Sequence, residues 1–218
     1  MKTYNIYLIR CGLTAENLEG RYLGHTDVSL CSRGVEELRQ LISEFTYPEA
    51  DAVFSSPLKR CTETAHLVYP EKEPITMREL AEFNFGEFEN RTAEELENHP
   101  LFADWLAGKP GVEAPFGDTN EGFGRRICSG LEKIVDGMLM SGVQNVAVIT
   151  HGGVIMHLLS RYALPEAKPH EWLTPPGCGY ALRINPQLWT SGKKLEAYKE
   201  IPEPERDFAY EKLLWGQE

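Results

Sequence analysis

Residues 4–12 read Tyr-Asn-Ile-Tyr-Leu-Ile-Arg-Cys-Gly, and residues 145–153 read Asn-Val-Ala-Val-Ile-Thr-His-Gly-Gly. Each stretch is a near-continuous apolar run of strand length, which is typical of a strand buried on both faces of a parallel sheet. The runs stop abruptly, at Arg10 in the first stretch and near His151 in the second, with glycine close behind. We therefore expect two buried strands that present these polar side chains at their carboxyl ends.

Strands and helices alternate along the rest of the chain. Further strands are expected over residues 52–54, 75–77, 179–184 and 195–200, the last two joined by a turn through Ser191-Gly192. Helices are expected over residues 33–45 with Ser32 as cap, from the capping segment Ser55-Ser56-Pro57 to Tyr69, over 92–98 and 119–140, and after His151. This alternation implies right-handed crossovers. The expected fold class is α/β, a three-layer α/β/α sandwich with a mostly parallel central sheet.

The composition indicates one globular domain. The chain has 218 residues, of which 42% are hydrophobic and 25% charged, an ordinary balance for a folded α/β domain. We therefore expect a single domain over residues 1–218, with a lid insertion at about residues 88–119 that includes a Gly/Pro-rich loop. The tail from about residue 202 is expected to dock back on this domain.

Charge and cysteine usage limit the partners. The formal net charge of -11 argues against nucleic acid and anionic membranes, because both recruit clustered Lys and Arg. Residues 1–10 show no signal-peptide pattern, and no stretch is long enough to span a bilayer. The five cysteines are odd in number without a C-x-x-C pair, so neither a disulfide framework nor a zinc site is indicated. Reduced thiols in a cytoplasm are the simplest interpretation, and no cofactor is expected.

Four segments together resemble the signatures of the histidine phosphatase superfamily, which includes the phosphoglycerate mutases. They are LIRCGLT (8–14) with Asn17, SSPLKRCTETA (55–65), LAEFNFGEFE (80–89) and THGG (150–153), in the expected order and separation. The resemblance spans roughly residues 4–184. It implies a phosphoglycerate mutase-like fold, a phosphoenzyme and a small phosphorylated substrate. Among small members, the chain looks most similar to the α-ribazole and broad-specificity phosphatases.

One departure from the family falls at the nucleophile. Histidine phosphatases have a histidine between the first Arg and Gly, which attacks phosphorus and becomes phosphohistidine, whereas this chain has Cys11. Cys31 and Asn90 are two further departures, at positions where threonine and glycine are common, and both are tolerable. The resemblance therefore implies that Cys11 occupies the nucleophile position without supplying the usual imidazole.

The chemistry of the other matched side chains supports a phosphate site. A phosphate ester is a dianion whose transferring group is stabilised by positioned cations and hydrogen-bond donors. Arg10 and Arg60 can each present a planar fork to its oxygens, and His151 and Asn17 can donate further hydrogen bonds. Glu82 can protonate the leaving alkoxide and then activate water. The expected catalytic set is Cys11, Glu82 and His151, and the expected phosphate-binding set is Arg10, Arg60, His151 and Asn17. No metal is expected.

Three functions are compatible with a cysteine at position 11. The first is a phosphomonoesterase scaffold that the replacement of its nucleophile disables or impairs. The second is a natural pseudo-phosphatase that binds a phosphorylated ligand without turnover. The third uses Cys11 itself as nucleophile, although Asn17 stands where the phosphate loop of cysteine phosphatases has an arginine. The intact Glu82 favours the first, because a carboxylate beside the anion would weaken simple binding.

Overall fold

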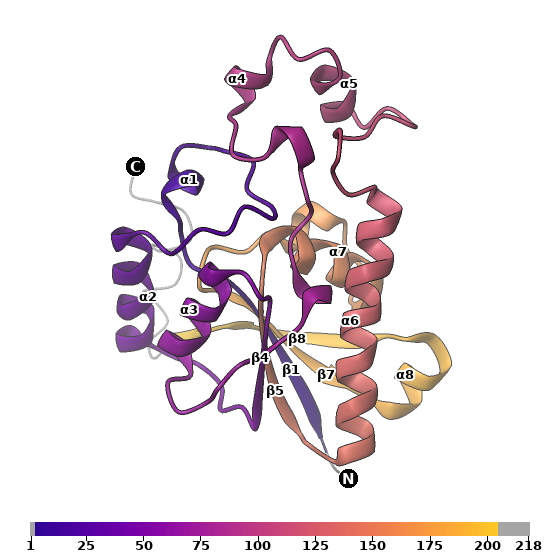
Figure 1. Ribbon diagram of the computed structural model, residues 1–218. Helices are drawn as coiled ribbons and strands as arrows, with labels where there is room; N and C mark the ends of the chain where they lie inside the picture. Colours follow the sequence, from indigo (N-terminus) through magenta and orange to yellow (C-terminus); the bar gives the residue numbers. More distant parts are fainter. Residues whose placement is uncertain (1–2, 205–218) are drawn as a thin grey trace.

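The structure of the protein is a computed structural model that describes residues 3–204 (Figure 1). One sheet has the strand order β4-β3-β5-β1-β7-β8-β6. Its strands are β1 (Tyr4–Arg10), β3 (Ala52–Ser55), β4 (Ile75–Thr76), β5 (Asn145–Thr150), β6 (Ala163–Leu164), β7 (Gly179–Ile184) and β8 (Leu195–Ile201). Neighbours from β4 to β1 are parallel, as are β6 and β8, whereas β7 is antiparallel to β1 and β8. The predicted mostly parallel sheet is confirmed.

Helices cover both faces of this sheet. The α-helices of the described residues are α1 (Ala15–Leu18), α2 (Ser32–Glu44), α3 (Lys59–Val68), α4 (Ala93–Leu96), α5 (Phe102–Leu106), α6 (Asn120–Ser141), α7 (Gly152–Tyr162) and α8 (Pro186–Gly192). Figure 1 shows α2 and α3 on one side of the sheet and α6 on the other. Within residues 3–204, none of the helices combines the length and apolar character needed to cross a bilayer.

Alternate side chains of β1 enter two separate cores. Ile6 and Leu8 belong to the core that α6 and α7 cover. Tyr7 and Ile9 belong to the opposite core, which α3 covers. Because both faces of the strand are buried, the sequence run contains no alternation of polar and apolar residues. The three-layer sandwich predicted from that run is confirmed.

Several local predictions were wrong at helix ends and turns. The cap of α2 is Cys31, whose Sγ accepts the Gly34 N–H at 3.3 Å, and not Ser32. The segment before α3 provides no side-chain cap; instead Asp27, from a distant loop, accepts the Lys59 N–H at 2.7 Å. The expected turn through Ser191-Gly192 is the end of α8.

Several short elements were not predicted. Besides the helices α1 and α5, they include β6 and a separate two-stranded sheet of β2 (Phe45–Thr46) and β9 (Glu203–Pro204). These strands are two residues long, too short to leave a periodic signal in the sequence. The tail beyond residue 204 lies outside the described residues, and so does its predicted docking.

Residues 88–119 contain α4 and α5, which stand away from the sheet at the top of Figure 1. Their apolar side chains form a small core of their own with aromatic residues of neighbouring loops. Tyr22 contacts Trp105 and Phe102 edge to face, so the loop after α1 is joined to this segment. That this segment acts as a lid remains a prediction.

Candidate active site

The pairing of β1 with β5 brings two distant parts of the sequence together. Arg10 is the register partner of Thr150, and the Cys11 N–H donates to the Thr150 carbonyl at 2.8 Å. His151 follows directly and forms the N-cap of α7. The ends of two parallel strands therefore place the Cys11 and His151 side chains next to each other, as the sequence predicted.

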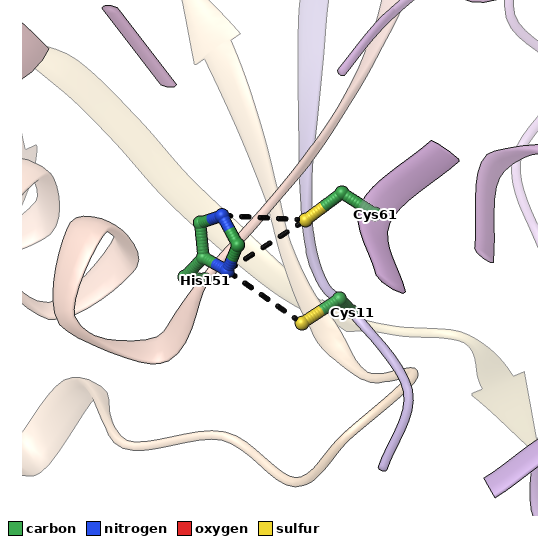
Figure 2. A group of neighbouring side chains, drawn as sticks. All are labelled: Cys11, Cys61 and His151. Carbon is green, nitrogen blue, oxygen red and sulfur yellow. Dashed lines mark hydrogen bonds between the residues drawn. The ribbon is translucent and has the colours of Figure 1, made fainter. Parts of the chain in front are cut away.

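Cys11, Cys61 and His151 form a buried group in which both sulfurs point toward the imidazole (Figure 2). The Cys11 Sγ lies 3.7 Å from His151 Nδ1. The Cys61 Sγ lies 3.7 Å from the same nitrogen and 3.4 Å from Nε2. Sequence reasoning missed Cys61, although it directly follows Arg60 in a matched segment. The sequence signal that could have revealed Cys61 was its position in the first turn of a helix whose N-terminus faces the ends of β1 and β5.

Ser56 fixes the orientation of the imidazole. Its Oγ lies 2.8 Å from His151 Nε2, and Ser56 stands directly after β3, the strand beside β5. The Ser56 N–H donates to the Ile149 carbonyl at 2.9 Å, which fixes its backbone to β5. Ser56 therefore holds the imidazole at Nε2, and Nδ1 faces the Cys11 sulfur.

The two thiols differ in acidity. A hydrogen bond from the Cys61 thiol holds the pKa of Cys11 well below its usual range, and His151 and Arg60 act in the same direction. Burial raises the pKa of Cys61 well above its usual range, and the neighbouring Cys11 sulfur adds to this. Cys11 is thus the more acidic thiol of the pair, and Cys61 is the one that donates a hydrogen bond to it.

Arg60 is buried and is positioned by a loop. Its guanidinium donates to the Gly24 carbonyl at 2.6 Å and to the Thr26 carbonyl at 2.9 Å. The loop is held in turn by the Glu89 carboxylate, which accepts the backbone N–H groups of Gly24, His25 and Thr26. Burial raises the pKa of Glu89, but the hydrogen bonds that it accepts outweigh burial and lower the pKa. An ionised Glu89 therefore fixes the carbonyls that orient Arg60.

Two glycines after His151 make room for two further site residues. The Arg10 guanidinium lies against Gly152, where an added Cβ would be 3.4 Å from Nε, and its Nη1 donates to the Thr174 carbonyl at 2.7 Å. Glu82 lies against Gly153, whose N–H donates to the carboxylate at 2.9 Å. A Cβ on Gly153 would be 2.5 Å from the Glu82 Oε1.

Two guanidinium groups bring positive charge to the site. Within residues 3–204, neither Arg10 nor Arg60 forms an ion pair with a carboxylate; both donate to backbone carbonyls. Glu82 is 8% exposed and accepts the N–H groups of Phe83 and Gly153. Two guanidinium groups, an imidazole and a nearby carboxylate can bind a phosphate dianion and exchange a proton with its leaving oxygen.

Asn17 has a structural role that the sequence did not indicate. Its Oδ1 accepts the Thr14 N–H at 3.3 Å, and the Asn17 N–H donates to the Thr14 hydroxyl, which together cap α1. Among the described residues, Asn17 forms no hydrogen bond to Arg10, Arg60 or His151. Its contact with phosphate stays a prediction.

A cavity of about 440 Å³ lies beside Glu82. Its wall includes Glu82 and Gly153 and is otherwise rich in aromatic rings, among them Tyr22, Phe83 and Phe123. A larger hollow of about 810 Å³ along α6 and α7 contains none of the predicted site residues. Of the predicted site residues, only Glu82 belongs to the wall of the aromatic cavity.

Comparison with known proteins identifies relatives of this chain. A family model described as "Histidine phosphatase superfamily (branch 1)" matches residues 6–193. The adenosylcobalamin/alpha-ribazole phosphatase of Escherichia coli is 29% identical over 194 residues, which cover 85% of this chain and 92% of that protein. The broad-specificity phosphatase YOR283W of Saccharomyces cerevisiae is 30% identical over 176 residues, covering 76% of this chain and 73% of that protein.

Solved structures show the same fold. The alpha-ribazole phosphatase from Shigella flexneri superposes with a TM-score of 0.77 at 24% identity, over 91% of this chain and 96% of that one. The three-layer arrangement with a phosphoglycerate mutase-like sheet is therefore shared with these proteins.

The acidity of Cys11 can be measured directly. In reduced, metal-free protein, we expect Cys11 to give a thiolate absorbance that Cys11→Ser abolishes. This absorbance should persist at pH values well below the usual range of thiol pKa values. Because the folded-state pKa is lowered, the thiolate stabilises the fold above the unfolded-state pKa, and this contribution is lost as pH falls through the folded-state pKa. Cys61→Ala should raise the Cys11 pKa. A titration that Cys11→Ser leaves unchanged would contradict this assignment.

Proposed function

The chain belongs to the histidine phosphatase superfamily and has its phosphatase scaffold, and from this premise we propose that it is a phosphomonoesterase for a small phosphorylated metabolite. The phosphate binds between Arg10, Arg60 and His151, and position 11 is the place of the nucleophile. With cysteine at that position, turnover through the phosphoenzyme is impaired. The protein requires no cofactor for this chemistry.

The observation that carries this proposal is the end of the β1–β5 pair. There the Cys11 sulfur lies 3.7 Å from His151 Nδ1, beside a buried Arg60 whose charge has no carboxylate partner among the described residues. The family resemblance assigns each of these groups a role in phosphate binding or catalysis. A phosphoryl group bound by these cations would have its phosphorus next to position 11 and its leaving oxygen on the side of Glu82.

The reaction divides into two balanced steps. In the first, the side chain at position 11 attacks phosphorus, the bond from phosphorus to the alcohol oxygen breaks, and Glu82 gives its proton to that oxygen. In the second, water attacks phosphorus and Glu82 accepts its proton, while the bond from phosphorus to the side chain at position 11 breaks, which frees that side chain and releases inorganic phosphate. Arg10, Arg60 and His151 stabilise the charge on the equatorial oxygens in both steps.

Cysteine weakens the first step for a geometric reason. The cysteine sulfur lies closer to the backbone than an imidazole nitrogen would, so in-line attack from Cys11 is displaced by about an ångström, and a displacement of this size can cost about 10²-fold in rate. The sulfur is also held by its contacts with Cys61 and His151. The binding groups are intact, while the attacking atom is misplaced.

The cavity beside Glu82 supports a small organic phosphate as substrate. Its volume of about 440 Å³ and its aromatic wall suit a compact, partly apolar alcohol group next to the proposed proton donor. Relatives named alpha-ribazole phosphatase and broad-specificity phosphatase suggest the same class.

One observation favours a second candidate function. Because the pKa of Cys11 is lowered, its sulfur has more thiolate character than that of an ordinary cysteine and can itself attack phosphorus to give an S-phosphocysteine. This function predicts fast turnover by the unmodified protein that alkylation of Cys11 abolishes. A pseudo-phosphatase, in contrast, would bind phosphate esters and stay inert even with histidine restored.

Restoring the histidine tests the proposal. Cys11→His should raise the hydrolysis of small alkyl phosphates by at least about 10³-fold, since loss of a nucleophile typically costs this much or more. The phosphoenzyme should be acid-labile, as a phosphoramidate is. Cys11→Ser is the matched control and should stay inactive, and all assays include a chelator. An inert Cys11→His variant that still binds phosphate esters would refute the proposal in favour of the pseudo-phosphatase.

The role of Glu82 can be separated from binding by the choice of leaving group. In the Cys11→His background, Glu82→Gln should slow the hydrolysis of alkyl phosphates strongly and that of p-nitrophenyl phosphate much less, because a good leaving group needs little protonation. The readout is the ratio of kcat/KM values for the two substrates. Equal losses on both would show that Glu82 acts in binding instead.

A further inference from the structure

Cys61 has no role in the proposed phosphatase chemistry, yet its sulfur shares one buried cluster with Cys11 and His151. One ligand atom from each of the three residues lies within 4.8 Å of the other two. We propose that Cys11, Cys61 and His151 bind a thiophilic divalent metal ion, with Zn²⁺ as the natural choice, and leave one coordination position for water or an anion. This proposal goes beyond the proposed function and does not depend on it.

The two distances from sulfur to Nδ1 match those of a tetrahedral metal centre. Both sulfurs lie 3.7 Å from the same nitrogen, His151 Nδ1. With zinc–sulfur and zinc–nitrogen bonds of about 2.3 and 2.0–2.1 Å, a tetrahedral angle separates sulfur and nitrogen by about 3.6 Å. Because the Cys61 Sγ also lies 3.4 Å from Nε2, the imidazole or the Cys61 side chain must reorient so that Nδ1 faces both sulfurs when a metal ion binds (Figure 2).

The donor set is also of the right chemical kind. Two thiolates and one imidazole bind Zn²⁺ in preference to Mg²⁺ or Ca²⁺, which require oxygen ligands. Three protein ligands with an open fourth position are typical of zinc sites that bind a further small ligand. No carboxylate is needed in this set.

The three ligands are held by rigid parts of the fold. Cys11 directly follows β1 and its N–H donates to the Thr150 carbonyl at 2.8 Å. Cys61 lies in the first turn of α3, where its N–H donates to the Leu58 carbonyl at 2.9 Å. All three side chains are buried, so little side-chain freedom remains to be lost when the metal binds.

The hydrogen bond to Ser56 prepares His151 as a ligand. Nε2 lies 2.8 Å from the Ser56 Oγ, and donation of the Nε2 proton to this oxygen leaves Nδ1 with a free electron pair. Such a partner on the other ring nitrogen is the usual support of a metal-binding histidine. Ser56 is therefore a positioning residue for the metal.

Charge does not oppose the site. Arg60 is close enough to Cys11 to favour its thiolate, and a bare cation would be repelled by this guanidinium. Two thiolates cancel the charge of one Zn²⁺, so the occupied site is neutral before its fourth ligand binds. Coordination displaces the remaining thiol proton to solvent. The Arg60 guanidinium then favours binding of an anion, rather than a cation, at the fourth coordination position of the metal.

Cobalt provides the probe. Reduced protein freed of metal by a chelator is titrated with Co²⁺, and we expect a sulfur-to-cobalt charge-transfer band with the visible bands of tetrahedral cobalt. The signal should saturate at one equivalent, and Zn²⁺ should displace it. Cys61→Ser should weaken Zn²⁺ binding by about 100-fold or more, and Ser56→Ala by about 10- to 100-fold. Cys31→Ser is the matched control and should bind as the unaltered protein does, because a serine hydroxyl can replace the α2 cap.

Alkylation of the unaltered protein gives a second readout that needs no folded variant. Bound Zn²⁺ should slow the reaction of iodoacetamide with Cys11 and Cys61 and leave Cys31 unaffected, as mapped by mass spectrometry. Absence of a cobalt–thiolate band, saturation only at large excess, or a band that survives Cys61→Ser would overturn the proposal. So would a Cys11–Cys61 disulfide in air combined with no metal binding after reduction. Metal binding is measured without any phosphatase turnover, so a negative binding result can be distinguished from a negative phosphatase assay.

Discussion

The hydrogen bond from the Cys11 N–H to the Thr150 carbonyl, at the end of the β1–β5 ladder, is the constraint on which the site depends. It fixes the backbone of the proposed nucleophile position beside the start of α7. His151 is thereby placed at the Cys11 sulfur, and Gly152 and Gly153 bring Arg10 and Glu82 against the same helix terminus. A register shift between these two strands would separate Cys11 from His151 and Arg10 from Gly152, because side chains alternate between faces.

A second set of contacts orients Arg60 from the opposite side. Glu89 fixes the loop of Gly24 and Thr26, and the carbonyls of that loop hold the guanidinium. A carbonyl carries only partial charge, so Arg60 is positioned without being neutralised and keeps its charge for an anion. In the proposed phosphate site and in the proposed metal site, uncharged hydrogen-bonding groups orient the reactive side chains.

Sequence patterns predicted the features that depend on local periodicity. The buried runs of β1 and β5 and the matched segments led to the sheet, the three layers and the placement of Cys11 beside His151. Contacts between distant residues left no such pattern. The Asp27 cap of α3, the Glu89 clamp and the approach of Cys61 to His151 join residues separated by tens of positions, with |i−j| of 90 for the last pair. The recognised sequence spacings of metal ligands join residues that are close together in the chain. A search for these spacings therefore did not find this cluster.

The central claim is that the ends of β1 and β5 form an anion pocket around position 11. A crystal structure of the metal-free protein soaked in vanadate tests it most directly, since vanadate adopts the geometry of a phosphoryl group in transfer. We expect vanadate between Arg10, Arg60 and His151, with the Cys11 sulfur on its inner side. Vanadate bound elsewhere, with this pocket empty, would contradict it.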